Sequence, residues 1–194
     1  MTADLVSPLT AWTSRLAALA PALSVAELPF RSQLTVRVSA PEAIAAMGEA
    51  LGVAFPAACT FTSGTGPFGA VEVLWLGPDE FLVVAPPGHQ VAIEEVVRGA
   101  LGTSRGSVVD TSAQRTTVAL EGPRVRDVLA HGCSVDLHPS SAPAGTCVQT
   151  LLARTGIVLQ VNGDDRCTVL VRSSFAGYFA AWLADACTEY LEVP

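Results

Sequence analysis

Two glycine-rich segments match the patterns of cofactor-binding or catalytic loops. Residues 64–69 (GTGPFG) fit the GxGxxG pattern, which binds a dinucleotide pyrophosphate where it opens a helix. Here Pro67 lies inside the pattern and a strand-like stretch follows, so we predict a mobile loop. Residues 102–106 (GTSRG) fit the GxSxG pattern of a nucleophilic serine, which requires a strand before it and a helix after it. This copy lies between a predicted helix and a predicted strand, and it therefore indicates a turn.

Histidines and cysteines near residue 135 are of the types that bind zinc. The candidate ligands are His131, Cys133, His138 and Cys147, but their spacing matches no common structural zinc site. The acidic pairs 94–95 and 164–165 fall on a predicted helix surface and a predicted turn, where solvation explains them. No set of nucleophile, base and orienting residue can be assembled. We therefore expect no catalytic, cofactor-binding or metal-binding residue in this chain.

Charge and cysteine usage narrow the class of protein. The eleven basic residues are scattered arginines without one lysine, and the net charge is −7. This argues against a nucleic-acid surface and against lysine-dependent Schiff-base chemistry. The five cysteines form no CxxC pair, which favours buried reduced thiols over disulfides. No apolar run is long enough to span a membrane and no signal peptide is evident, so we expect a cytoplasmic protein.

The surface is expected to be short of charge. Of the 194 residues, 50 % are hydrophobic and 15 % charged, against about 25 % charged in an average soluble domain. An alanine- and valine-rich core accounts for part of this excess. A surface that a partner covers accounts for it better, because exposed apolar area tends to mark interfaces.

The elements that position these residues occur in two similar sets. Each half has a strand, a proline, a helix closed by a glycine, a β-hairpin and a second helix. We predict an α+β fold of two pseudo-repeated βαββα units with antiparallel sheets. The expected parts are an N-terminal helical arm (1–32), a first half (33–111) and a second half (112–194), with the halves tightly joined.

Helix starts and ends follow from local signals. The arm helix is expected to begin at Ser7 and Pro8 and to end at Pro21, and its apolar stripe packs on this chain's core or on another subunit. Pro123 opens the helix of the second half, Gly132 ends it as a left-handed cap, and its buried face carries Val125, Val128 and Leu129. Ser173 or Ser174 caps the last helix, whose aromatic stripe is typical of core.

Nine segments occur in the order found in a known family. They are 27–30 (ELPF), 76–83 (LGPDEFLV), 109–116 (VDTSAQRT), 122–124 (GPR), 127–129 (DVL), 132–133 (GC), 136–139 (DLHP), 149–152 (QTLL) and 171–175 (VRSSF). As a set they resemble the gamma subunit of heterotetrameric sarcosine oxidase. The sequence departs from the family pattern at Ala113, and the predicted loop 55–68 has no clear counterpart.

The resemblance implies a structural subunit of an enzyme, inactive on its own. The family's complex oxidises sarcosine to glycine, forms hydrogen peroxide, and yields 5,10-methylenetetrahydrofolate or formaldehyde. FAD, FMN, NAD, tetrahydrofolate and zinc would then belong to the alpha, beta and delta subunits. The fold would be similar to that of the folate-binding glycine-cleavage T-protein.

The segment 132–139 is the part of the chain that we expect to contact a partner. It is too short for a helix, and a loop with a family signature in a chain without catalysis is explained by docking or bracing. The expected partner contacts are Arg115, Arg124, Cys133, Asp136, His138 and Pro139. In the alternative, Asp136 and His138 form hydrogen bonds only within this chain.

Two other functions stay open from the sequence. One is a stand-alone folate-binding aminomethyltransferase-like protein, in which Asp110 would grip the pterin. The other is an interaction module of a different flavoenzyme.

Overall fold

The computed structural model describes residues 5–20 and 22–191. The chain divides into two compact units. Unit 1 comprises Met1–Pro29, Arg115–Ala144 and Gln149–Pro194, and unit 2 comprises Phe30–Gln114 and Gly145–Val148. The N-terminal segment thus belongs to the same unit as the second half and is not a separate arm. The expected end of its helix at Pro21 lies outside the described residues.

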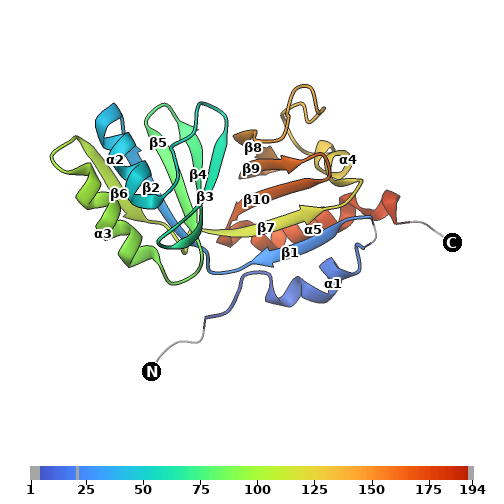
Figure 1. Cartoon of the computed structure of the whole chain (residues 1–194). Helices are drawn as coiled ribbons and strands as arrows, with labels where there is room; N and C mark the ends of the chain where they lie inside the picture. The colour runs from blue at the N-terminus through green and yellow to red at the C-terminus, as the bar shows by residue number, and fades with distance from the viewer. Residues whose placement is uncertain (1–4, 21, 192–194) are drawn as a thin grey trace. The chain divides into compact units, whose positions relative to one another are not determined.

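Unit 2 is an antiparallel sheet with two helices that pack against each other (Figure 1). The strand order is β3-β4-β5-β2-β6. A single apolar cluster fills its core, with residues from β2, β4, β5 and both helices. The elements are β2 (Ser32–Val38), α2 (Pro41–Leu51), β3 (Phe61–Gly66), β4 (Gly69–Gly77), β5 (Glu80–Ala85), α3 (Gln90–Leu101) and β6 (Gly106–Asp110).

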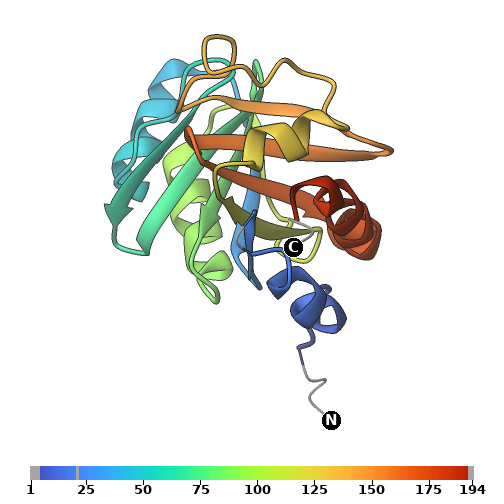
Figure 2. The same ribbon diagram turned by 90° about the vertical axis from the view of Figure 1, so that its right-hand side faces the viewer.

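Unit 1 has the second five-stranded sheet, in the order β1-β7-β10-β9-β8. Figure 2 looks onto α4 and α5, which lie in front of the strands of this sheet. Buried Val118, Val169 and Phe179 belong to the core of this unit. The elements are α1 (Thr13–Ala17), β1 (Ser24–Leu28), β7 (Arg115–Glu121), α4 (Val125–Ala130), β8 (Cys147–Leu152), β9 (Thr155–Gly163), β10 (Arg166–Arg172) and α5 (Ala176–Ala186).

The predicted α+β fold with two similar antiparallel sheets is confirmed, and the two sheets correspond strand by strand. In unit 2 the strand that precedes the first helix, β2, pairs with β5 and with the edge strand β6. In unit 1 the equivalent strand β7 pairs with β10 and with the edge strand β1. β6 follows α3 in the chain, whereas β1 comes from the N-terminus. The N-terminal segment therefore supplies the edge strand that the second half lacks.

The prediction of a mobile loop at residues 64–69 is wrong, because residues 61–66 form β3, which pairs with β4. The glycines of the segment allow the backbone of α2 to approach the strand. A β-carbon at Gly66 would lie 2.1 Å from the carbonyl oxygen of Leu51, and one at Gly64 would lie 2.7 Å from that of Gly52. The GxGxxG match thus serves packing between a helix end and a strand.

Four predicted helix boundaries differ from the structure. α4 begins at Val125 rather than at Pro123. Gly132 is not among the glycines with positive φ, and a β-carbon there would lie 2.7 Å from the Trp182 ring, so this glycine is explained by close packing. No serine side chain caps α5, because a 3-10 turn (η2, Ser173–Phe175) leads into it.

The fourth difference concerns the N-terminal helix, which is a 3-10 turn (η1, Thr10–Trp12) followed by the short α1. Its apolar stripe packs on its own unit, since Leu9, Leu16 and Leu19 are buried and α1 contacts β1 and α5. Across the described residues, no helix has the length and apolar character needed to cross a membrane.

Candidate functional site

A polar groove in unit 1 contains three of the residues predicted to contact a partner. Its volume is about 580 Å³, and it lies between α4, the loop that follows α4, and the turn between β9 and β10. Asp136, His138 and Pro139 line it from the loop. Because Arg126 joins these three segments, we call it the Arg126 groove.

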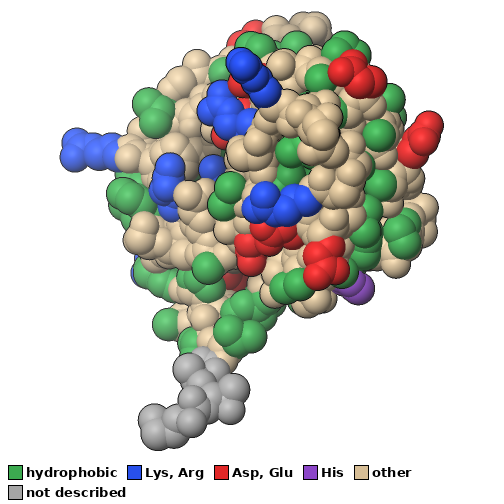
Figure 3. All heavy atoms as spheres, turned by 90° about the vertical axis from the view of Figure 1, so that its left-hand side faces the viewer, with side chains coloured by type: hydrophobic (Ala, Val, Ile, Leu, Met, Phe, Trp, Pro, Cys, Tyr) green, Lys and Arg blue, Asp and Glu red, His purple; other side chains and the backbone are tan. Residues whose placement is uncertain are grey.

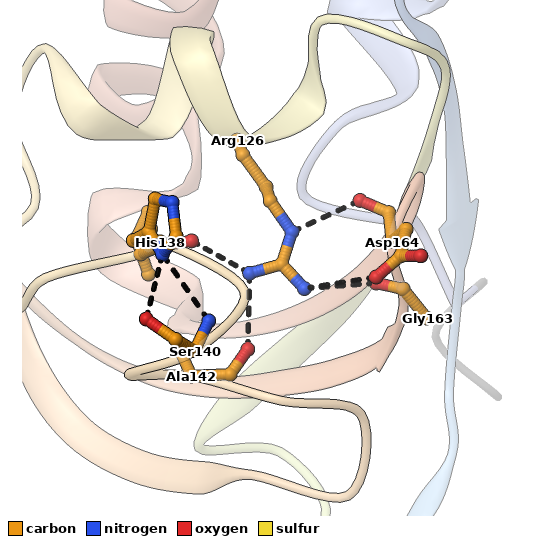
Figure 4. A network of polar contacts seen from close by, with 7 residues as sticks. Arg126, His138, Ser140, Ala142, Gly163 and Asp164 are labelled. Atoms are coloured by element: carbon orange, nitrogen blue, oxygen red, sulfur yellow. Dashed lines mark hydrogen bonds and ion pairs between the residues drawn. The ribbon is translucent and has the colours of Figure 1, made fainter.

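Arg126 connects the loop to the hairpin turn through its guanidinium group (Figure 4). Its Nη1 donates to the carbonyl oxygens of Leu137 at 2.6 Å and Ala142 at 3.0 Å. On the other side, Nε donates to the Asp164 carbonyl at 3.0 Å and Nη2 to the Gly163 carbonyl at 3.3 Å. The side chain is only 14 % exposed. One arginine thus satisfies four backbone acceptors in two segments far apart in sequence.

The loop after α4 is also braced by its own side chains. Asp136 accepts from the backbone amide of His138 at 2.9 Å and from the hydroxyl of Ser141 at 2.6 Å. The Ser141 hydroxyl, followed by the His138 amide, lowers the pKa of Asp136 below its usual value. His138 Nδ1 lies 2.7 Å from the Ser140 hydroxyl. Hydrogen bonds within the loop therefore account for the position of the Asp136 carboxylate, whereas His138 is exposed.

The other three predicted contact residues lie elsewhere in unit 1. Arg124, at the start of α4, pairs with Asp127 at 3.1 Å, and its guanidinium lies 5.6 Å from the centre of the Tyr190 ring. Cys133 forms an isolated β-bridge with Leu152. Arg115 begins β7 and lines a different, smaller pocket. The groove therefore brings together three of the six residues.

The groove offers charged side chains and exposed loop residues from three segments of unit 1. In the part of the chain that the structure describes, no group of three His, Cys, Asp or Glu side chains could hold a metal ion. His131 instead contacts the Tyr190 hydroxyl and the Glu189 carboxylate, each at 2.9 Å. The hydrogen bond with Glu189 raises the pKa of Tyr190 to about 12.

The cysteines and Asp110 have local roles. Burial raises the pKa of the Cys147 thiol to about 12 and the pKa of the Cys167 and Cys187 thiols to about 11, which disfavours the reactive thiolate. Asp110, considered above as a pterin ligand, accepts from the Ser112 amide at 2.9 Å at the end of β6. Its carboxylate thus caps a turn.

A second hollow, with a volume of about 590 Å³, runs along α2 in unit 2. Its lining is mainly apolar and includes Ile44, Val53 and Phe55. Figure 3 shows the face that carries α2 and α3, where hydrophobic side chains lie scattered among charged groups. None of the residues predicted to contact a partner belongs to this hollow.

Arg126 is the main residue of the site that sequence reasoning missed. The only local signal is its position beside Val125, at the flank of the buried stripe of α4. Its partners are backbone carbonyls, and backbone groups carry no residue-specific pattern.

Comparison with known proteins gives a consistent result at the sequence level. The model of the "Sarcosine oxidase, gamma subunit family" matches residues 37–189. The chain is 37 % identical over 169 residues to sarcosine oxidase subunit gamma of Corynebacterium sp. (strain P-1), covering 87 % of this chain and 81 % of that protein. It is 38 % identical over 170 residues to the same subunit of Arthrobacter sp., covering 87 % and 82 %.

The fold is shared with two solved structures. A chain of the heterotetrameric sarcosine oxidase from Corynebacterium sp. U-96, in complex with pyrrole 2-carboxylate, matches with a TM-score of 0.87 at 34 % identity, and 98 % of each chain is covered. The glycine cleavage system aminomethyltransferase T from Bartonella henselae matches with a TM-score of 0.64 at 17 % identity. The match covers 92 % of this chain and 50 % of that one, and it indicates a common fold.

Proposed function

The chain belongs to the sarcosine oxidase gamma subunit family, and we propose that it serves as a structural, non-catalytic subunit of a heterotetrameric sarcosine oxidase. The observation that carries this proposal is the agreement, over nearly the whole length of both chains, with a chain of such an enzyme. The chemistry of the grooves supports it, because neither hollow offers a nucleophile with an adjacent base.

In the proposed complex the reaction takes place on other subunits. Sarcosine is oxidised to glycine with formation of hydrogen peroxide, and the one-carbon unit leaves as 5,10-methylenetetrahydrofolate or formaldehyde. The alpha, beta and delta subunits carry FAD, FMN, NAD, tetrahydrofolate and zinc. The contribution of this chain is to hold a partner subunit in place.

The Arg126 groove is the proposed contact surface on this chain. Arg126 and Asp136 fix the backbone of the loop, so the loop needs little ordering when a partner binds. The exposed side chains of His138 and Pro139 then face a partner from a rigid support. At the opposite wall, the Asp164 carboxylate lies 3.8 Å from Arg126 Nη2, and its side chain is 86 % exposed, so it can also accept a hydrogen bond from that partner.

Co-purification tests the proposal. The chain is expressed with an affinity tag together with the alpha, beta and delta subunits of the proposed enzyme, and the eluate is passed over gel filtration. We expect one peak that contains this chain, its partners and bound flavin. A monomer that binds folate, or a complex with an unrelated protein and no flavin, would show that the proposal is wrong.

A further inference from the structure

Two cysteines of unit 2 are neighbours across a pair of short antiparallel segments. The Cys147 amide donates to the Cys59 carbonyl at 2.8 Å, and the adjacent residues Thr60 and Thr146 form an isolated antiparallel β-bridge. Cys59 and Cys147 are therefore directly opposed. The Cα atoms of opposed residues that share a backbone hydrogen bond are about 5.5 Å apart. This separation is inside the range of about 4.4–6.8 Å found in disulfide bonds.

The two cysteines differ in their access to solvent. Cys59 is exposed, whereas Cys147 is buried. Burial raises the pKa of the Cys147 thiol most, and the charge of the nearby Cys59 thiolate raises it further, in agreement with the short distance between the two backbones. An oxidant from solvent therefore reaches Cys59 first. Cys147 is the neighbouring thiol that can react second.

The backbone at Cys59 has a conformation that is uncommon for a cysteine. Its φ is 59°, in the left-handed region that glycine adopts more easily. The residue lies in a turn in which the Thr60 amide donates to the Ala57 carbonyl at 3.2 Å. Because glycine would form this turn with less strain, the turn alone does not explain a cysteine at this position. A thiol that reacts at the surface does explain it.

A covalent bond at Cys147 would fasten a short segment to the rest of unit 2. Gly145–Val148 belongs to unit 2, although the residues before and after it belong to unit 1. Backbone hydrogen bonds hold this segment, among them the one from the Phe61 amide to the Gly145 carbonyl at 3.2 Å. A disulfide bond would make the attachment permanent and would also restrict the unfolded chain, because residues 59 and 147 are far apart in sequence.

We propose that hydrogen peroxide oxidises Cys59 and that Cys147 then closes a disulfide bond with it. The Cys59 thiolate attacks one peroxide oxygen and the O–O bond breaks, which gives a sulfenic acid and a hydroxide that takes up the thiol proton as water. The Cys147 sulfur attacks the sulfenic sulfur, the S–O bond breaks, and the hydroxyl leaves with the Cys147 proton as a second water. Two thiols are thus oxidised and one peroxide is reduced. The inference rests on the proposed function for its oxidant, because the proposed enzyme forms hydrogen peroxide.

The first test adds hydrogen peroxide to the full chain at low protein concentration, alkylates the remaining thiols and identifies the peptides by mass spectrometry. We expect a peptide pair joined through residues 59 and 147 that dithiothreitol separates. Cleavage after arginine leaves Cys133 and Cys147 on one peptide, so Cys133→Ser is the control and should keep the cross-link, whereas Cys59→Ser should lose it. If Cys59 stays reduced, ends as a sulfinic acid or pairs with another cysteine, this inference is overturned and the proposed function still stands.

The second test asks whether peroxide from the complex itself drives the reaction. The co-purified complex is supplied with sarcosine and oxygen, with and without catalase, and the same peptide pair is measured. We expect the cross-link to accumulate during turnover and to be lost when catalase is present. A complex that releases peroxide without forming the cross-link would contradict the inference. A complex that forms no peroxide from sarcosine would overturn the proposed function, while the first test would still decide whether the two cysteines form the bond.

Discussion

At the residue scale, the site depends on Arg126. Charged side chains are rarely buried without partners, and this one is nearly buried because four backbone carbonyls surround it. It therefore fixes the position of the loop that carries Asp136 and His138 without being exposed to a partner itself. This separates the residue that supports the site from the residues that face outward.

Replacing Arg126 tests that support. Arg126→Ala should lower the free energy of unfolding by about 2 kcal/mol, because it leaves carbonyl oxygens in a partly buried place without donors. Arg124→Ala is the matched control, since Arg124 is exposed and its ion pair with Asp127 should contribute less than about 1 kcal/mol. Urea denaturation of the two variants measures both values. If both variants lost the same small amount of unfolding free energy, the hydrogen bonds of Arg126 would not stabilise the fold.

Asp136 should make the stability of the loop depend on pH in the acid range. Its pKa in the folded chain is below the ordinary value of 3.8, so its stabilising contribution is fully present above that value and is lost as the pH falls through the folded pKa. The difference in unfolding free energy between wild type and Asp136→Ala should therefore be constant from neutral pH to about pH 5 and shrink below about pH 4. Denaturant unfolding at a series of pH values measures it. A difference that grows on acidification would contradict the assignment.

How far the site could be predicted differs from residue to residue. Asp136, His138 and Pro139 lie together because they are neighbours in sequence. A short polar segment that follows a helix can adopt few positions relative to that helix. Arg115 was also predicted as a contact, but the sheet places it at a separate pocket, opposite Arg172. Pairing between strands distant in sequence determines that position, and no local pattern encodes it.

At the element scale, the strands and helices with strong periodicity were predictable. Proline and glycine at the ends of α2 specify that helix locally. The β-branched residues Thr116, Thr117 and Val118 favour a strand at β7. β1 and β3 were not predicted, because both are edge strands without a fully buried residue, and their apolar and polar residues do not alternate regularly in sequence. The glycines of β3 indicated a loop in the sequence, but in the structure they allow contact between the strand and the C-terminal end of α2.

The role of these glycines leads to a prediction with opposite signs at two positions. Gly66→Ala should destabilise the chain by about 2–3 kcal/mol, since the added methyl group would overlap the Leu51 carbonyl. Gly99→Ala, at an exposed position in α3 with nothing within 4 Å, should stabilise it by about 0.5–1 kcal/mol. Thermal and urea unfolding of both variants decide the matter. An unchanged free energy of unfolding for Gly66→Ala would mean that the backbone of β3 does not contact the end of α2.

At the scale of the whole molecule, the low content of charge agrees with a chain that is covered by partners. Exposed large hydrophobic residues occur in both units, among them Val91, Val109 and Leu151. The described surface also has two hollows, one in each unit, and a smaller pocket in unit 1. These features fit the role in assembly that is proposed for this chain.

Solubility should depend on those partners. The purified chain alone is expected to self-associate as its concentration rises, because apolar surface stays uncovered, and co-expression with the large subunit should suppress this. Light scattering over a concentration series compares the two preparations. A monodisperse free monomer at high concentration would count against a surface that is covered in the complex.

The most direct measurement is sarcosine-dependent release of hydrogen peroxide by three gel-filtered samples: this chain alone, the co-expressed complex, and the other subunits expressed without this chain. The account predicts that the chain alone is colourless and inactive and that the complex is active. It also predicts that the set lacking this chain yields less assembled, active enzyme. Peroxide formation by the isolated chain would contradict a structural role in sarcosine oxidase. So would full assembly and full activity of the other subunits when they are expressed without this chain.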